Sequence, residues 1–328
     1  MAKILLTGGA GYVGSRLVPA LLAQNYEVRV LDNLMYGQTS LLPYFFDDRF
    51  EFIRGDIRDE RTIKNALRGV DLLIYLAAIV GAPACKHDPQ LAKAVNQDAT
   101  ILLSTYVSDS QGLIYASTGS NYGAVDGICT EDTLLNPLSE YGVTKTAAER
   151  ALWGRKNVII CRYATAFGLS ERLRLDLMVN DLTFQAIRNK QLVVYEADYR
   201  RTFIHVYDIA RSIIHMLKFF NFMSGEIYNV GHECMNLTKR SIVAMIQEKV
   251  KCLVTYASIG SDPDQRDYEV SYGKIRATGF ETKVGLEAGI DELVKAYPMI
   301  NQEGIARKQS LHHEMTNVRV RSSPVKQA

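Results

Sequence analysis

Three glycines near the start of the chain constrain its fold more than any other feature. Gly8, Gly11 and Gly14 lie in the segment TGGAGYVG, between the apolar run KILLTG and the helix-period run GYVGSRLVPALLAQ. Such a triplet gives a tight strand-to-helix turn, lets the backbone touch a pyrophosphate and lets the helix pack closely on the strand. The segment therefore predicts the first βα turn of a dinucleotide-binding fold.

Short apolar runs then alternate with helix-period segments along the first half of the chain. The runs EVRVLD, FEFIRGD, DLLIYLAA, GLIYAS and NVIICRY each fit a strand that is buried on both faces. This alternation is typical of βαβ units and predicts an α/β fold with a Rossmann-type, doubly wound parallel sheet. We place this domain at residues 1–168, with part of 202–230 returning to it.

The pattern loosens after Arg162. Helical stretches near Met178–Arg188 and Thr238–Lys249, together with isolated strands, predict a smaller mixed α/β lobe over residues 169–300. We interpret this lobe as the substrate-binding part. Residues 301–328 are polar, and we expect a poorly ordered tail there.

Charge and cysteine content exclude several classes of protein. The 328 residues include 38 basic and 36 acidic side chains, so a net charge of +2 gives no reason to expect a nucleic-acid or membrane partner. The five cysteines lie far apart without a CxxC pair, which argues against a zinc site and a disulfide framework. We expect no metal, free thiols in a reducing cytoplasm, and no signal peptide before the first strand.

A carboxylate ends the second predicted strand. Asp32 lies 18 residues beyond Gly14, where an acidic side chain accepts hydrogen bonds from the adenosine ribose and repels a 2′-phosphate. We therefore expect NAD rather than NADP as the cofactor. Asp56, in RGDIRD, closes the third strand similarly, and it either touches the adenine ring or caps the following helix.

Tyr141 and Lys145 lie four residues apart in SEYGVTKTAAER, so on a helix they share one face. An ammonium group there favours the ionised phenol, whose ordinary pKa of about 10 is too high for a general base near neutrality. The pair alone is weak evidence, because the chain has 18 tyrosines. Its place shortly after the STGS cluster, where a nicotinamide ring would lie, strengthens the interpretation.

These segments together resemble the extended short-chain dehydrogenases/reductases of the NAD-dependent epimerase/dehydratase family, which act on nucleotide sugars. The resemblance runs from Lys3 to about Tyr297. It rests on TGGAGYVG, DN at Asp32, GDIRD, LAA at Leu76, Thr118, the Tyr141 and Lys145 pair, RRTFIHVYDIA, YNVG and DQRDY.

The resemblance implies a role for each of these residues. Tyr141 would take the proton from a sugar hydroxyl, normally at C4, while hydride passes to NAD, and Lys145 would hold the nicotinamide ribose and lower the tyrosine pKa. Thr118 would bond the same sugar oxygen, unless it merely caps the strand end. The implied cofactor contacts, besides Tyr141 and Lys145, are Gly8, Gly11, Tyr12, Val13, Gly14, Asp32, Asn33, Asp56, Ile57, Leu76, Ala77, Ala78 and Asn96.

Two positions after Thr118 bear on the reaction. Family members that dehydrate the sugar carry an Asp-Glu pair there, because elimination of water needs an acid and a base. This chain has Gly119 and Ser120, which we predict to line the sugar site. The sequence thus disfavours a 4,6-dehydratase and favours an epimerase or a plain C4 dehydrogenase.

The two remaining enzyme activities stay open. The loop IVGAPACKHDP and the segment RLRLDLMVNDL resemble bacterial enzymes that oxidise C4 of GDP-linked heptoses, which favours the dehydrogenase with a GDP-sugar or other NDP-sugar substrate. A non-catalytic NAD-binding regulator on the same fold is the alternative of another class. The tyrosine, the lysine and the sugar-side arginines argue against it, since such relatives generally lose them.

By resemblance, Arg201 and Arg266 clamp the nucleotide diphosphate and Asn180 contacts the same group, although each arginine also fits a solvated surface charge. Thr165 and Leu169 depart from the usual family residues, which puts one sugar or phosphate contact in doubt. We interpret His205 as a packed strand residue. Cys85 either lines the sugar pocket or is a buried inert thiol.

The resemblance further implies a homodimer through a four-helix bundle. The helices would be those around Leu91–Val107 and Tyr141–Trp153, whose apolar stripes suit such packing. Ordinary packing on the sheet is the alternative. The stripe residues are Ala94, Ile101, Leu102, Ala148 and Leu152.

Overall fold

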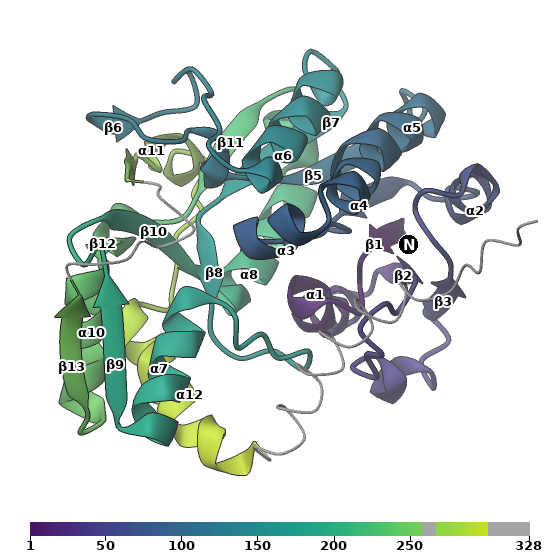
Figure 1. The fold of residues 1–328 in the computed structure, drawn as a ribbon. Coiled ribbons are helices and arrows are strands. Elements are labelled where there is room, and N and C mark those ends of the chain that lie inside the picture. The colour runs from purple at the N-terminus through teal and green to yellow at the C-terminus, as the bar shows by residue number, and fades with distance from the viewer. Residues whose placement is uncertain (258–266, 301–328) are drawn as a thin grey trace, which may run out of the picture.

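A seven-stranded parallel sheet forms the centre of the larger part of the molecule (Figure 1). The computed structural model describes residues 1–257 and 267–300. The strand order is β11-β7-β5-β4-β1-β2-β3. These strands are β1 Lys3–Thr7, β2 Glu27–Asp32, β3 Phe50–Arg54, β4 Leu72–Tyr75, β5 Gly112–Thr118, β7 Val158–Tyr163 and β11 Ile227–Val230.

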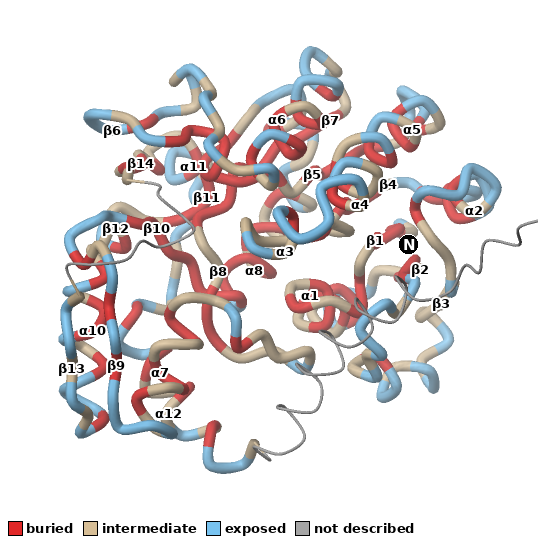
Figure 2. Tube along the Cα trace, viewed as in Figure 1, coloured by how far each residue is buried: buried red, intermediate tan, exposed pale blue. Residues whose placement is uncertain are grey.

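Helices cover both faces of this sheet, which confirms the predicted Rossmann-type α/β fold. Apolar residues of α1 and α8 pack on one face, and those of α2, α5 and α6 pack on the other. Figure 2 shows the strands buried between these layers. The helices are α1 Tyr12–Ala23, α2 Glu60–Ala66, α3 Ala82–His87, α4 Pro89–Lys93, α5 Ala99–Tyr106, α6 Glu140–Leu152, α8 Val206–Lys218 and α9 Phe220–Met223.

All strands of the sheet are parallel, but the order in which they are added changes direction at β1. Strands β2 and β3 extend the sheet on one side of β1, and β4 begins its other side. In a doubly wound sheet, the loops at the carboxyl ends of such neighbouring strands diverge and leave a crevice for a ligand. The glycine-rich turn after β1, the Asp32 end of β2 and the loop after β4 all meet there.

The smaller lobe has its own core, which includes Phe203, Ile242 and Ile290. It contains the strand set β12-β10-β8 and the parallel pair β13-β9. Its strands are β8 Thr165–Phe167, β9 Gln191–Tyr195, β10 Arg200–His205, β12 Asn236–Thr238 and β13 Leu253–Ala257, and its helices are α7 Met178–Asn189, α10 Lys239–Lys249 and α12 Leu286–Ala296. A further parallel pair, β6 Ile128–Cys129 with β14 Glu269–Val270, and helix α11 Gly273–Arg276 pack on the core of the larger part.

Two sequence predictions fall on residues outside the described part of the chain, namely Arg266 and the tail at 301–328. Within the described part, no helix is both long enough and apolar enough to cross a membrane. All five cysteines are free thiols.

Candidate active site

The glycine-rich turn has the geometry that a bound pyrophosphate needs. Gly8 has a φ of +70°, and a Cβ there would lie 2.8 Å from the Ala77 Cα. A Cβ on Gly14 would lie 2.5 Å from the Gly9 Cα, so helix and turn are in direct backbone contact. Helix α1 begins after Gly11 without a side-chain cap or an acidic residue in its first turn, which leaves Tyr12 and Val13 N–H groups for an anion.

Asp32 is held in place at the end of β2. Its carboxylate oxygens accept hydrogen bonds from the backbone N–H groups of Ala10 at 3.0 Å and Leu34 at 2.8 Å. Burial raises the pKa of this carboxyl, and the two N–H groups and Arg172 oppose that rise. The side chain is thus fixed where an adenosine ribose would lie, and these residues fit a dinucleotide.

The remaining expected contacts on the adenosine side lie next to it. Asp56 bonds Arg58 at 2.7 Å and Asn33 at 3.3 Å, and the Arg58 guanidinium lowers the pKa of Asp56 to about 2. Asp56 does not cap a helix, because Asp59 is the N-cap of α2. Ile57 is buried in the core under the sheet.

Asn96 bonds groups of the protein on three sides. Its amide accepts from Ile79 N–H at 2.8 Å and donates to the Ile79 carbonyl at 3.0 Å and to Thr144 Oγ1 at 3.2 Å. Both N–H donors are therefore used within the protein. Asn96 joins the loop after β4, which also contains Leu76, Ala77 and Ala78, to α6, and it has no donor left for a cofactor.

Helix α6 carries Tyr141 and Lys145 one turn apart, as predicted, and begins at the N-cap Ser139. Lys145 is only 2% exposed, and its Nζ lies 4.1 Å from the centre of the Tyr115 ring. Burial lowers the Lys145 pKa to about 7, and Glu149 one turn further along opposes that shift. Tyr141 packs beside Cys85 and Ile79 on the loop side of the crevice.

Thr118 is the last residue of β5 and caps the short turn Gly119–Asn121. Its Oγ1 accepts from Ser120 N–H at 3.1 Å and donates to Ser120 Oγ at 3.0 Å. The capping role weighed in the sequence analysis is therefore real. Because the acceptor and donor sides of a hydroxyl are separate, Thr118 can keep the cap and turn its proton toward a sugar oxygen.

Tyr268 fills the space beside Gly119. A Cβ on Gly119 would lie 3.1 Å from the Tyr268 phenol oxygen, closer than nearly all Cβ contacts. The phenol is buried and forms an edge contact with the Tyr122 ring. The position therefore has little room for a carboxylate, which the sequence alone could not indicate.

The residues expected on the substrate side lie in the smaller lobe. Arg201 is fully buried on β10, and its Nη1 donates to the Arg200 carbonyl at 3.0 Å. Asn180 donates to the carbonyls of Gly168 at 3.1 Å and Arg174 at 2.8 Å. Asn180 thus holds the loop between β8 and α7 with both of its side-chain N–H groups, and its contact with a diphosphate stays a prediction.

His205 and Cys85 have structural places, in agreement with the sequence interpretation. His205 Nδ1 caps α8, and its Nε2 lies 2.8 Å from Glu292. The Cys85 thiol donates to the Ile79 carbonyl at 3.3 Å, and burial raises its pKa to about 11.

A buried ion pair behind Lys145 was missed by the sequence analysis. Glu149 bonds Arg162 Nη2 at 2.6 Å and Arg162 Nε at 3.0 Å, and it accepts from Ser117 at 2.5 Å and Asn121 at 2.9 Å. Glu149 follows Lys145 by four residues, so the spacing was visible. The pairing of Glu149 on α6 with Arg162 on β7 was not.

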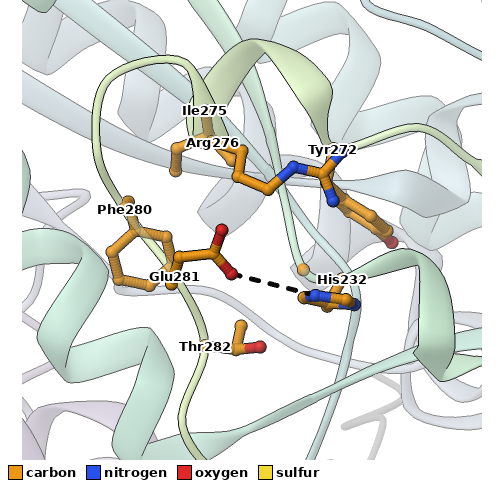
Figure 3. Close-up of a pocket in the computed structure, with 8 residues that line it drawn as sticks. His232, Tyr272, Ile275, Arg276, Phe280, Glu281 and Thr282 are labelled. Atoms are coloured by element: carbon orange, nitrogen blue, oxygen red, sulfur yellow. Dashed lines mark ion pairs between the residues drawn. The ribbon is translucent and has the colours of Figure 1, made fainter.

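A small pocket lies elsewhere, between the end of β11 and α11 (Figure 3). Its charged groups already face one another: His232 lies 3.9 Å from Glu281, and Arg276 lies 2.6 Å from Glu233. Leu152, Trp153 and Ile160 help to line a second small pocket at the foot of α6. Neither contains a residue of the predicted site.

The comparisons with known proteins agree with this geometry. The model of the NAD dependent epimerase/dehydratase family matches residues 4–231. The chain belongs to this family. Its members depend on NAD and modify nucleotide sugars, so this chain is an NAD-dependent nucleotide-sugar enzyme.

Three relatives illustrate the range of the family. An uncharacterised UDP-glucose epimerase of Bacillus subtilis is 30% identical over 249 residues, which cover 70% of this chain and 76% of that protein. A UDP-glucuronic acid 4-epimerase variant of Bacillus cereus, solved with NAD, is 26% identical with a TM-score of 0.82, covering 91% of this chain and 100% of that one. A dTDP-glucose 4,6-dehydratase of Streptomyces venezuelae, also solved with NAD, is 28% identical with a TM-score of 0.80, covering 90% and 97%. None of these names refers to a GDP-linked heptose.

Proposed function

We propose that this chain is a nucleotide-sugar 4-epimerase that inverts the sugar at C4. The epimerases among its relatives support this activity over the plain dehydrogenase that the sequence favoured. The observation that carries the proposal is the side-chain set at the end of β5. Thr118, Tyr141 and Lys145 are present, while Gly119 is hemmed in by Tyr268 and Ser120 has no charge.

The chain's own residues supply the proton chemistry. Tyr141 takes the proton from the C4 hydroxyl and later returns it, and the ammonium of Lys145 stabilises the phenolate between the two events. Thr118 bonds the same sugar oxygen and keeps it within reach of Tyr141. A bound NAD would supply the hydride chemistry at C4, and the residues named here hold the sugar oxygen and carry its proton.

Binding of the two ligands follows the division of the fold. The turn from Gly8 to Gly14, together with Asp32 and Asp56, would hold NAD. Arg201 and Arg266 would hold the nucleotide diphosphate of a UDP-, dTDP- or GDP-sugar. The buried, always charged guanidinium of Arg201 suits such an anion. Because the diphosphate is the same in all of these substrates, specificity for the base would come from other contacts.

A C4 dehydrogenase acting on a GDP-heptose is the second candidate, and one contact favours it. The two segments that resemble the heptose-oxidising enzymes meet in the structure. A Cβ on Gly81, in the first segment, would lie 3.9 Å from Nη2 of Arg174, in the second. The two segments therefore lie next to each other, as they would if both contacted the same substrate.

A panel of UDP-, dTDP-, GDP- and CDP-sugars, followed by chromatography and mass spectrometry, tests the proposal. Epimerisation gives a product of unchanged mass with a new retention time. A loss of two mass units with accumulation of NADH would establish the dehydrogenase instead. A loss of eighteen units would establish a dehydratase and overturn both candidates.

Tyr141→Phe provides the control for the chemical step. The variant keeps the fold and the cofactor turn but lacks the proton acceptor, so its turnover falls by roughly 10²- to 10⁴-fold. Val143→Ala, on the outer face of the same helix, is the matched variant and keeps activity. Undiminished turnover by Tyr141→Phe would show that the proton leaves by another route.

A further inference from the structure

The loop between β8 and α7, residues 168–177, runs from the smaller lobe across the start of α1. We call residues 168–176 the strap. Four hydrogen bonds attach it to the cofactor turn. The Tyr12 hydroxyl donates to the Gly168 carbonyl at 2.7 Å, Ser170 Oγ donates to the Tyr12 carbonyl at 2.6 Å, Ser15 Oγ and Ser170 Oγ lie 2.8 Å apart, and Arg172 N–H donates to Ser15 Oγ at 3.3 Å.

The root of the strap is rigid. Gly168 has a φ of +100°, and a Cβ there would lie 2.0 Å from His205 Nε2, so only glycine fits. Asn180 bonds both the N–H and the carbonyl of Gly168, and Leu169 N–H donates to Glu292 of α12 at 3.0 Å. The smaller lobe therefore fixes where the strap meets the cofactor turn.

The strap places two guanidinium groups beside this turn. Arg172 lies over the Tyr36 ring, with its Cζ 4.6 Å from the ring centre, on the Asp32 side of the crevice. Arg174 is bonded to Asp176, and its guanidinium lies near Gly81. Among the described residues, no carboxylate lies within ion-pair distance of Arg172.

This arrangement is electrostatically unfavourable without an anion. Burial and the neighbouring Arg174 charge both lower the pKa of Arg172, while the more distant Asp32 and Asp176 oppose this only in part. A bound anion beside the Arg172 guanidinium would offset the free-energy cost of its burial and of its repulsion by Arg174. The N-terminus of α1 attracts an anion to the same spot.

We propose that Arg172 is a cofactor-binding residue supplied by the smaller lobe, and that its guanidinium pairs with the diphosphate of bound NAD. The Arg172 backbone bonds Ser15 of α1 and its guanidinium lies over the Tyr36 ring, and these contacts favour the cofactor diphosphate over that of the sugar nucleotide. Such a strap would help an epimerase to retain NAD through the whole reaction. The proposal itself requires only that the chain binds NAD.

Calorimetric titration of the full chain, freed of nucleotide, tests the proposal without any substrate. Arg172→Gln is expected to weaken binding of NAD and ADP-ribose by roughly 10- to 100-fold, as loss of a charge-assisted hydrogen bond does. Binding of adenosine, which has no phosphate, is expected to stay the same. The NAD affinity of the variant should also depend less steeply on salt.

Three further measurements sharpen the test. Arg61→Gln removes one exposed positive charge on α2 and should leave NAD affinity unchanged. Arg172→Lys should recover part of the affinity. UDP, titrated into the NAD-loaded chain, should bind Arg172→Gln and the wild type equally well.

The proposal is overturned if Arg172→Gln binds NAD normally, if it loses adenosine as strongly as NAD, or if it loses only UDP. The first result would leave Arg172 without a ligand, the second would point to packing on Tyr36, and the third would assign the guanidinium to the sugar nucleotide. Should Arg172→Gln not fold, Ser170→Ala carries the test. It removes two of the four bonds between the strap and α1, those from Ser170 to Ser15 and to the Tyr12 carbonyl, and should weaken NAD binding several-fold. Unchanged affinity would contradict the proposal.

Discussion

Lys145 is a charged side chain that the fold holds almost entirely out of water. An unfolded lysine has a pKa near 10.4, whereas burial lowers the Lys145 pKa to about 7. Between these values the unfolded chain binds more protons than the folded chain, so the free energy of unfolding rises with pH. Burial of the ammonium therefore lowers the free energy of unfolding by its full amount below about pH 7, and this destabilisation disappears toward pH 10.

Lys145→Met tests this cost. The apolar side chain fits the site beside Tyr115 without a charge, so the variant should melt several degrees above the wild type at pH 6. A change of about 1 kcal/mol shifts Tm by roughly 2–4 °C in a domain of 150–250 residues. The difference should shrink by pH 9, as scanning calorimetry at both pH values would show. An equal difference at both would mean that Lys145 is not the titrating group.

Gly119 offers a second test at the level of one residue. Gly119→Asp with Ser120→Glu places the dehydratase pair in this chain, but the aspartate Cβ meets the Tyr268 phenol at 3.1 Å. We expect a lower Tm and no product that has lost eighteen mass units. Ser120→Glu alone is the control without the clash. Efficient dehydration by the double variant would show that Tyr268 yields easily.

The sequence indicates the geometry of a residue best where that geometry depends only on neighbouring residues of the chain. Gly8, Gly14 and Asp32 belong to one βα unit and its next strand, so their spacing defines their geometry. Asn96 and Asn180 are different. Their amides bond backbone groups brought to them by the fold, and no local pattern indicates which partner an amide will take.

At the scale of elements, strands buried on both faces were predictable because each forms a continuous apolar run. The pairs β6-β14 and β9-β13 were not, because each joins short segments far apart in the chain. The stripe on α6 was assigned to the wrong face. Ala148 and Leu152 share the inner face with Lys145 and are buried against the sheet, so they cannot form a dimer contact.

The Glu149 and Arg162 pair joins helix α6 to strand β7, and Ser117 and Asn121 extend it to β5. Glu149→Gln leaves the fully buried guanidinium without a counter-charge. It should lower the free energy of unfolding by about 3–5 kcal/mol, as broken buried pairs do. Urea denaturation measures this loss.

A double variant measures how much the two charges stabilise each other, apart from their other contacts. Glu149→Gln with Arg162→Met removes both charges, so it should be more stable than Glu149→Gln alone. Glu248→Gln, on the exposed side of α10, is the surface control. Additive losses in the double variant would show that the two side chains do not stabilise each other.

At the scale of the whole molecule, α5 and α6 lie side by side over one face of the sheet (Figure 1). Some apolar side chains of these two helices are exposed. Ile101 is 38% exposed and Val143 is 45% exposed, while Ala94 and Leu102 are partly buried. The α6 residue expected in the interface is therefore Val143, and not the buried Ala148 or Leu152. Two copies of this face would form the four-helix contact that the family resemblance implies.

We predict that the wild-type chain sediments as a homodimer at micromolar concentration and that Ile101→Glu with Val143→Glu sediments as a monomer. In a paired face, each glutamate would be buried without a partner and would meet its symmetry mate, which costs several kcal/mol. Val193→Glu changes an equally exposed valine on β9 and should leave the dimer intact. A monomeric wild type would contradict the predicted dimer. If the wild type is a dimer and only Val193→Glu dissociates it, this face is not the interface and the exposed strand β9 becomes the better candidate.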